Sequence, residues 1–129
     1  MHHRTILIVD NDPVAARALQ GRLERLGFPV EAIASSDDAA LPLLPRAAFA
    51  IVDVPPDWDS ARVHASTLLN QHAPAILFMI PESLEAELRL APSEESIAFI
   101  AKPFSDRELR THIDLALCKL DLARALHGI

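Results

Sequence analysis

Short apolar runs alternate with helix-like patterns five times along the chain, and this alternation restricts the fold more than any other feature. The apolar runs cover Ile6–Val9, Phe49–Val52, Ala75–Ile80 and Ile97–Ala101, and Pro29–Ala34, which contains Glu31, predicts a weaker strand. A short continuous apolar run is typical of a strand that is covered on both faces. Repeated strand–helix alternation therefore predicts an α/β fold with a parallel sheet and helices on both of its faces.

The segments between the apolar runs carry helix signals. Asp12 followed by Pro13 is typical of an N-cap and a first helical position, and Gly27 is expected to end that helix. Ser105 and Glu108 have the spacing of a capping box at the start of the last helix. Ser36, Asp37 and Asp38 are expected to open a second helix that Pro42 and Pro45 distort or break. Further helices are expected over about 60–71, over 82–90, and from 105 to about 127.

Length and composition exclude several classes of protein. A chain of 129 residues suits one domain with one core, here residues 1–129 with the core at about 4–117. The net charge of −6 and the lack of a Lys/Arg cluster disfavour a nucleic-acid surface. Cys118 is the single cysteine and no apolar run approaches membrane-spanning length. We therefore expect a cytoplasmic domain with no nucleic-acid or membrane partner.

Polar and charged residues stand where three of the predicted strands end. Asp10, Asn11 and Asp12 follow the first strand, Asp53 ends the third, and Lys102 follows the fifth. Ligands of open parallel sheets bind beyond the carboxyl ends of the strands, and these positions converge if the strand order is 2-1-3-4-5. Carboxylates from two strand ends favour Mg²⁺, and a nearby lysine could hold a phosphoryl oxygen. The pattern indicates phosphoryl transfer onto an aspartate.

Three segments carry a family resemblance. ILIVDNDP, FAIVD and IAKPFSDREL resemble the signature segments of response-regulator receiver domains of two-component signalling, in the family's order and over residues 4–117. The resemblance implies a flavodoxin-like, doubly wound five-stranded parallel sheet of order 2-1-3-4-5. It implies that Asp53 accepts the phosphoryl group, that Lys102 is the accompanying lysine and that Phe99 is the switch aromatic.

The resemblance also implies a cofactor and a partner. Mg²⁺ would be held by oxygens of Asp10, Asn11, Asp12 and Asp53 and by the backbone carbonyl of Pro55. The partner would be a histidine kinase or a phosphotransfer protein, and signals would pass through protein–protein contacts. No enzymatic activity is implied beyond the domain's own aspartyl phosphorylation and dephosphorylation.

The sequence departs from the family pattern at three places. Asn11 stands where a second acid is usual, so Mg²⁺ binding is expected to be weak. Met79 and Ile80 are the candidates for a switch position that usually carries a hydroxyl. The loop after Asp53 is short and rich in proline. The chain is therefore either a phospho-receiver with an atypical switch or a pseudo-receiver that binds a partner without phosphorylation.

A different enzyme class shares part of the pattern. Asp10-x-Asp12 after an apolar strand also resembles the nucleophile loop of haloacid-dehalogenase-type phosphatases, with Asp10 as the nucleophile. The chain is short for that family, and the segment after the fourth strand offers only Glu82 where an acidic pair is needed. Phosphorylation of Asp10 rather than Asp53 would decide for this alternative.

The last helix has more apolar surface than a sheet contact requires. Leu109, Ile113, Ala116, Leu120 and Ala123 form one stripe that can face the sheet. Leu115, Cys118, Leu122 and Leu126 form a second, offset stripe. The second stripe predicts a homodimer or a partner surface. The alternative is a broad core face followed by a frayed apolar tail.

Overall fold

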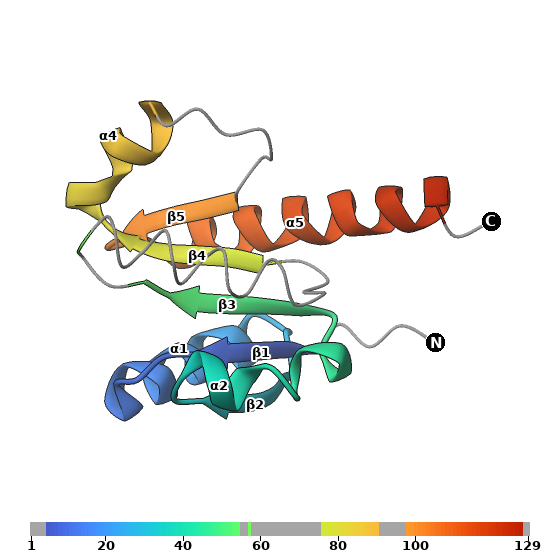
Figure 1. Ribbon diagram of the computed structural model, residues 1–129, viewed down its shortest axis with the longest axis horizontal. Helices are drawn as coiled ribbons and strands as arrows, with labels where there is room; N and C mark the ends of the chain where they lie inside the picture. Colours follow the sequence, from blue (N-terminus) through green and yellow to red (C-terminus); the bar gives the residue numbers. More distant parts are fainter. Residues whose placement is uncertain (1–4, 55–56, 58–75, 91–97, 128–129) are drawn as a thin grey trace.

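The computed structural model describes residues 5–54, 57, 76–90 and 98–127 of the chain. Its strands form one five-stranded sheet in the order β2-β1-β3-β4-β5, with every neighbouring pair parallel (Figure 1). The strands are β1 (Ile6–Val9), β2 (Val30–Ala34), β3 (Phe49–Asp53), β4 (Ile76–Pro81) and β5 (Ala98–Lys102). The predicted sheet and its strand order are confirmed.

The helices follow the strands as the alternation predicted. They are α1 (Pro13–Arg25), α2 (Asp37–Ala40), the 3₁₀ turn η1 (Leu44–Arg46), α4 (Glu82–Leu90) and α5 (Asp106–His127). Pro42 and Pro45 limit the second helix to α2 and η1, because proline lacks the amide proton that a continuing helix needs. The helix expected over 60–71 lies outside the described residues. In the described part of the chain, no helix has the length and apolar character needed to cross a membrane.

Side chains and a glycine set the ends of α1. The Asp12 carboxylate accepts hydrogen bonds from the backbone amides of Val14 (3.0 Å) and Ala15 (3.3 Å), and Pro13 occupies the first helical position. Gly27 follows the helix with a φ of 93°, a conformation that costs little only without a Cβ. These ends place the start of α1 beside the carboxyl end of β1.

The predicted capping box opens α5. The Ser105 hydroxyl accepts a hydrogen bond from the Glu108 amide (3.1 Å), and the Glu108 carboxylate accepts one from the Ser105 amide (2.9 Å). The hydrogen bond from the Ser105 amide, followed by the contribution of the Ser105 side chain, lowers the pKa of the Glu108 carboxyl group. The cap fixes the point at which the chain leaves β5 and enters α5.

Alternate residues of each strand face opposite sides of the sheet and build two cores. Ile8, Ile51 and Ile100 face the side covered by α1 and α5. Val9 and Val52 face the side covered by α2, η1 and α4. Figure 1 shows α2 in front of the sheet, with α1 and the first half of α5 behind it. Because both faces are covered, the carboxyl ends of the strands are the natural place for a ligand.

Candidate functional site

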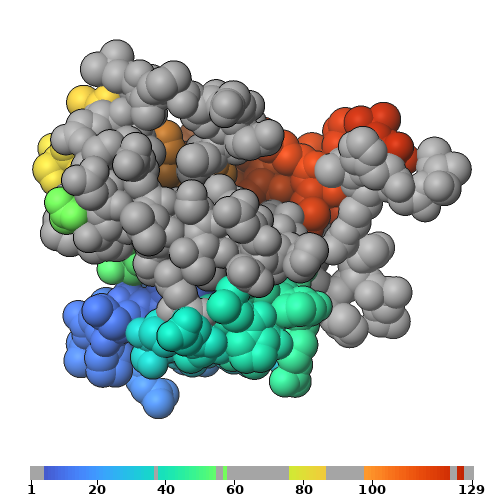
Figure 2. Space-filling view, viewed as in Figure 1, coloured from blue at the N-terminus to red at the C-terminus, as the bar shows by residue number. Residues whose placement is uncertain are grey.

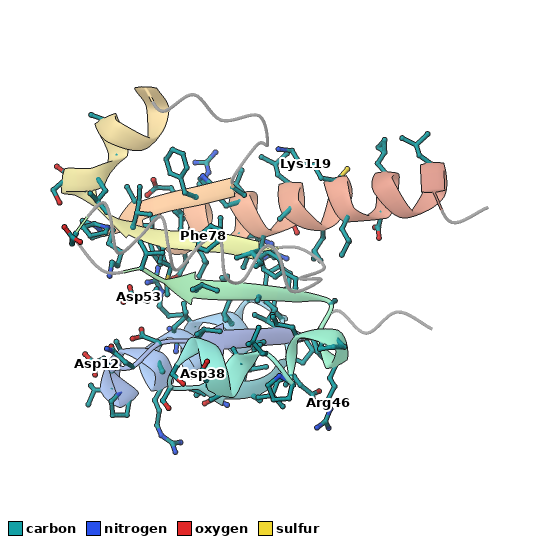
Figure 3. The ribbon with its side chains drawn as sticks, in the orientation of Figure 1. Asp12, Asp38, Arg46, Asp53, Phe78 and Lys119 are labelled. Atoms are coloured by element: carbon teal, nitrogen blue, oxygen red, sulfur yellow. The ribbon has the colours of Figure 1, made fainter. Side chains whose placement is uncertain are left out.

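Three polar side chains come from the carboxyl ends of β1, β3 and β5. Asp10, Asp53 and Lys102 each lie two residues after an isoleucine of the α1/α5 core, so the strand alternation turns all three toward the same side. Val9 pairs with Val52 in the β1–β3 ladder, which brings Asp10 and Asp53 next to each other. Figure 3 shows Asp53 at the end of β3, at the same end of the sheet as Asp12. The structure therefore brings together the residues that the sequence indicated.

Lys102 forms an ion pair with Asp53 across the intervening strand. Lys102 Nζ donates to Asp53 Oδ1 at 2.5 Å, and the Asp53 side chain is 23% exposed. β3 and β5 flank β4, so their ends are separated by about 10 Å, and only a long side chain bridges that span. The ammonium group is thus held where it can also bind an anion attached to Asp53.

Asp10 is the buried acid of the site. Its residue is 7% exposed, and it is the only charged residue that is buried in the described part of the chain. Its Oδ1 accepts a hydrogen bond from the Asp12 amide at 2.9 Å. Burial raises the pKa of the Asp10 carboxyl group, and the nearby Asp53 carboxylate raises it further, while the Asp12 amide and Lys102 oppose this shift. An added cation would relieve the repulsion between the two carboxylates.

We expect Asp10→Asn to stabilise the metal-free protein at neutral pH. Because the pKa of Asp10 is higher in the folded chain than in the unfolded chain, ionised Asp10 lowers stability above its folded pKa. The asparagine removes that charge and keeps an oxygen for the Asp12 amide, for a gain of about 1 kcal/mol. Urea unfolding in EDTA at pH 7 measures the gain, which should shrink as the pH falls through the raised folded pKa and should be gone below the unfolded pKa of about 3.9. A loss of stability at pH 7 would contradict this reading of Asp10.

Some of the oxygen atoms at the site are suitable ligands for a hard cation such as Mg²⁺. Asp10 and Asp53 offer carboxylate oxygens from adjacent strands, and Asn11 is exposed directly after Asp10. Asp12 is exposed, and its Oδ1 caps α1. The predicted ligand Pro55 lies outside the described residues. Among the described residues, no group of three or more His, Cys, Asp or Glu side chains is arranged to hold a metal ion.

The three predicted switch residues lie on β4 and β5, on two different faces. Met79 is buried in the α1/α5 core and its Cα pairs with that of Asp53. Ile80 is buried in the opposite core, and Phe99 packs against the same core while half-buried. Ile80 is therefore the residue that shares a face with Phe99. Both candidates on β4 are apolar, so neither could donate a hydrogen bond to a group on Asp53.

Arg22 makes a contact that the sequence did not indicate. Its Nε donates to Asp106 Oδ1 at 2.7 Å, one of its terminal nitrogens donates to the Phe104 carbonyl at 2.9 Å, and its guanidinium lies 4.8 Å from the centre of the Phe104 ring. Arg22 thereby ties the end of α1 to the segment that follows Lys102. Basic residues are common in the last turn of a helix because they interact favourably with the helix dipole. The position of Arg22 in the sequence therefore did not predict its contact with Phe104 and Asp106.

Comparisons with known proteins agree on the fold. No protein-family model matches the sequence, and no curated protein matches it. The chain is similar to a solved receiver domain from Clostridium thermocellum (19% identity, 92% of this chain and 98% of that chain, TM-score 0.76). It is also similar to the receiver domain of an HD-domain protein from Pseudomonas fluorescens Pf-5 (20% identity, 93% and 98%, TM-score 0.73). The chain has the fold of a response-regulator receiver domain.

A third receiver structure covers nearly the whole chain. The receiver domain of a putative Luxo repressor protein from Vibrio parahaemolyticus shares 15% identity, covers 99% of this chain and 100% of that chain, and has a TM-score of 0.74. The fold predicted from the three signature segments is thus confirmed, and with it the flavodoxin-like strand order.

Proposed function

We propose that this chain is a receiver domain that accepts a phosphoryl group on Asp53 from a histidine kinase or phosphotransfer protein. The observation that carries the proposal is the Asp53–Lys102 ion pair beside the buried Asp10. Asp53 is a half-buried nucleophile at a strand end, and Lys102 already lies within reach of any oxygen attached to it. The haloacid-dehalogenase alternative has less support, because Asp10 is the more buried acid and pairs with no lysine in the described part of the chain.

The transfer would proceed by in-line attack. A carboxylate oxygen of Asp53 bonds to the phosphorus of the donor phosphohistidine while the bond from phosphorus to the imidazole nitrogen breaks, and the electron pair returns to the imidazole. Lys102 Nζ then exchanges its carboxylate partner for an oxygen of the transferred group. Mg²⁺, if bound by Asp10, Asp53 and Asn11, would supply positive charge at the phosphoryl oxygens.

We further propose that the conformational response to phosphorylation is weak or atypical. A bound group shifts a conformational equilibrium only through contacts that differ between the two states. Met79 and Ile80 have no hydroxyl that could move toward the phosphoryl group, so one such contact is missing. Signalling would therefore depend on changes close to Asp53 and on partner contacts, rather than on a large movement of Phe99.

Incubation with Mg²⁺ and acetyl phosphate, followed by intact-mass measurement, tests the proposal. We expect the mass of one phosphoryl group to be added and to be removed by hydroxylamine, which cleaves acyl phosphates. Amide chemical shifts of the same sample should change near Asp53 and little around Phe99. No added mass with any small phosphodonor, or with a cognate kinase, would favour the pseudo-receiver alternative.

A further inference from the structure

The second half of α5 is only partly used by the core. Leu109, Ile113, Ala116 and Leu117 are buried against the sheet, whereas the helix continues to His127. Figure 1 shows α5 running past the ends of β4 and β5, and Figure 2 shows its last turns at the edge of the molecule. The sheet contact therefore accounts for the first half of the helix and not for its continuation.

The predicted second stripe of α5 is exposed. We call it the outer stripe; its members are Leu115, Cys118, Leu122 and Leu126. Leu115, Leu122 and Leu126 are 57%, 56% and 70% exposed. Among the described residues, the only other exposed large hydrophobic side chain is Val14. In the described part of the chain, three of the four exposed large apolar side chains thus lie on one face of one helix, which is typical of an interaction surface.

The first three members of the outer stripe have the spacing of a two-stranded coiled coil, and Leu126 falls at the neighbouring e position. Leu115, Cys118 and Leu122 follow one another at three and four residues, like successive a, d and a positions of a heptad, and the exposed Ala125 supplies the next d position. Lys119 is exposed, and Figure 3 shows its side chain on α5. This face can therefore meet a second helix without disturbing the core.

The charges that flank the outer stripe select both the partner and its direction. Asp114 precedes Leu115 and Lys119 follows Cys118, which are g and e positions five residues apart. In a parallel pair the g residue of one helix faces the following e residue of the other, so Asp114 meets Lys119 twice. An antiparallel pair would instead bring Asp114 and Asp121 of the two helices together, with like-charge repulsion. Neither Asp114 nor Lys119 has an ion-pair partner within the described part of the chain.

We propose that the outer stripe binds a second copy of this chain as a parallel two-stranded coiled coil. The two-fold axis runs along the helix pair, the outer stripes of the two protomers meet, and each Asp114 faces Lys119 of the other copy. The two sheets then lie on opposite outer sides of the pair, because each sheet contacts the other face of its own α5. This dimer does not depend on phosphorylation of Asp53.

The single cysteine allows a direct test. Parallel pairing places Cys118 of both copies at the same d position. The two Cα atoms then lie within the separation that a disulfide needs, so mild oxidation should give a covalent dimer. Cys118→Ser combined with Ala125→Cys should also cross-link. In an antiparallel pair centred on position 118 the two introduced cysteines would lie roughly 20 Å apart, since a helix rises about 1.5 Å per residue. Absence of a cross-link in this second variant would overturn the parallel arrangement.

Charge reversal separates the specific coiled coil from simple apolar association. By sedimentation, Lys119→Asp should weaken the dimer about tenfold, and Asp114→Lys combined with Lys119→Asp should restore it to within about twofold. Leu122→Asp should give a monomer, whereas Val14→Asp, which changes an exposed apolar residue on α1, should leave the dimer intact. A wild-type protein that stays monomeric at high micromolar concentration, or a double variant without rescue, would overturn the proposal.

Discussion

Replacing Asp53 with asparagine is expected to abolish phosphoryl labelling of the chain by acetyl phosphate. An amide oxygen is a far poorer nucleophile than a carboxylate oxygen and cannot form the acyl phosphate. The fold should remain intact, because Asp53 lies at the end of β3 and its side chain contributes to neither core. Intact-mass measurement should show no added phosphoryl group, and circular dichroism should show an unchanged helix and sheet content.

Two further variants complete this experiment. Asp38→Asn is the matched control, because it removes an exposed carboxylate on α2 and should leave labelling unchanged. Asp10→Asn should slow labelling of Asp53 by weakening the metal site without moving the label. Labelling that survives Asp53→Asn and is lost in Asp10→Asn would assign the nucleophile to Asp10. That result would replace the receiver chemistry with that of the haloacid-dehalogenase class.

Asn11→Asp is expected to tighten Mg²⁺ binding by about tenfold or more. The substitution adds a carboxylate directly after the buried Asp10, and Mg²⁺ prefers charged oxygen ligands. The same carboxylate increases the repulsion in the metal-free site, so the apo protein should lose stability while the Mg²⁺-bound protein recovers it. Calorimetric titration measures the affinity, and the melting temperature with and without Mg²⁺ measures the linked change in stability.

The control for Asn11→Asp separates a new ligand from a change in net charge. Ala18→Asp adds the same charge on an exposed turn of α1, away from the strand ends, and should alter Mg²⁺ affinity little. If Asn11→Asp binds Mg²⁺ no more tightly than Ala18→Asp does, position 11 is not a metal ligand. Asp12 would then be the remaining candidate beside Asp10, despite its role as the cap of α1.

Four of the five strand positions were readable in the sequence as short, continuous apolar runs, whereas Pro29–Ala34, which contains Glu31, indicated its strand more weakly. Asp12 with Pro13, and Ser105 with Glu108, showed where two helices begin, and the structure places the caps there. The ends of β3, β4 and β5 lie one residue later than predicted, because Asp53, Pro81 and Lys102 still pair in the ladders, and β2 begins one residue later, at Val30. These features depend on neighbours along the chain, so local periodicity and capping chemistry suffice to predict them.

The candidate site was predictable only in part. Asp10, Asp53 and Lys102 were identified because strand ends of a parallel sheet meet at one edge, but the sequence alone could not assign the partner of each side chain. The cap role of Asp12, predicted from Pro13, is what the structure shows, and a metal role for Asp12 stays a prediction. Ile80 and Met79 were equivalent in the sequence, and the strand alternation in three dimensions placed only Ile80 on the face of Phe99.

The sequence by itself determined the alternating elements, the helix starts and the kinds of residue at the strand ends, because those properties arise from local periodicity and local hydrogen bonding. Only the tertiary structure decided that Lys102 reaches across β4 to Asp53, that Asp10 is buried beside them, and that Arg22 holds Phe104 and Asp106. Such contacts join residues tens of positions apart. They depend on the order of the strands and the placement of the helices. That arrangement follows from burying apolar side chains on both faces of the sheet, and no local sequence pattern specifies it.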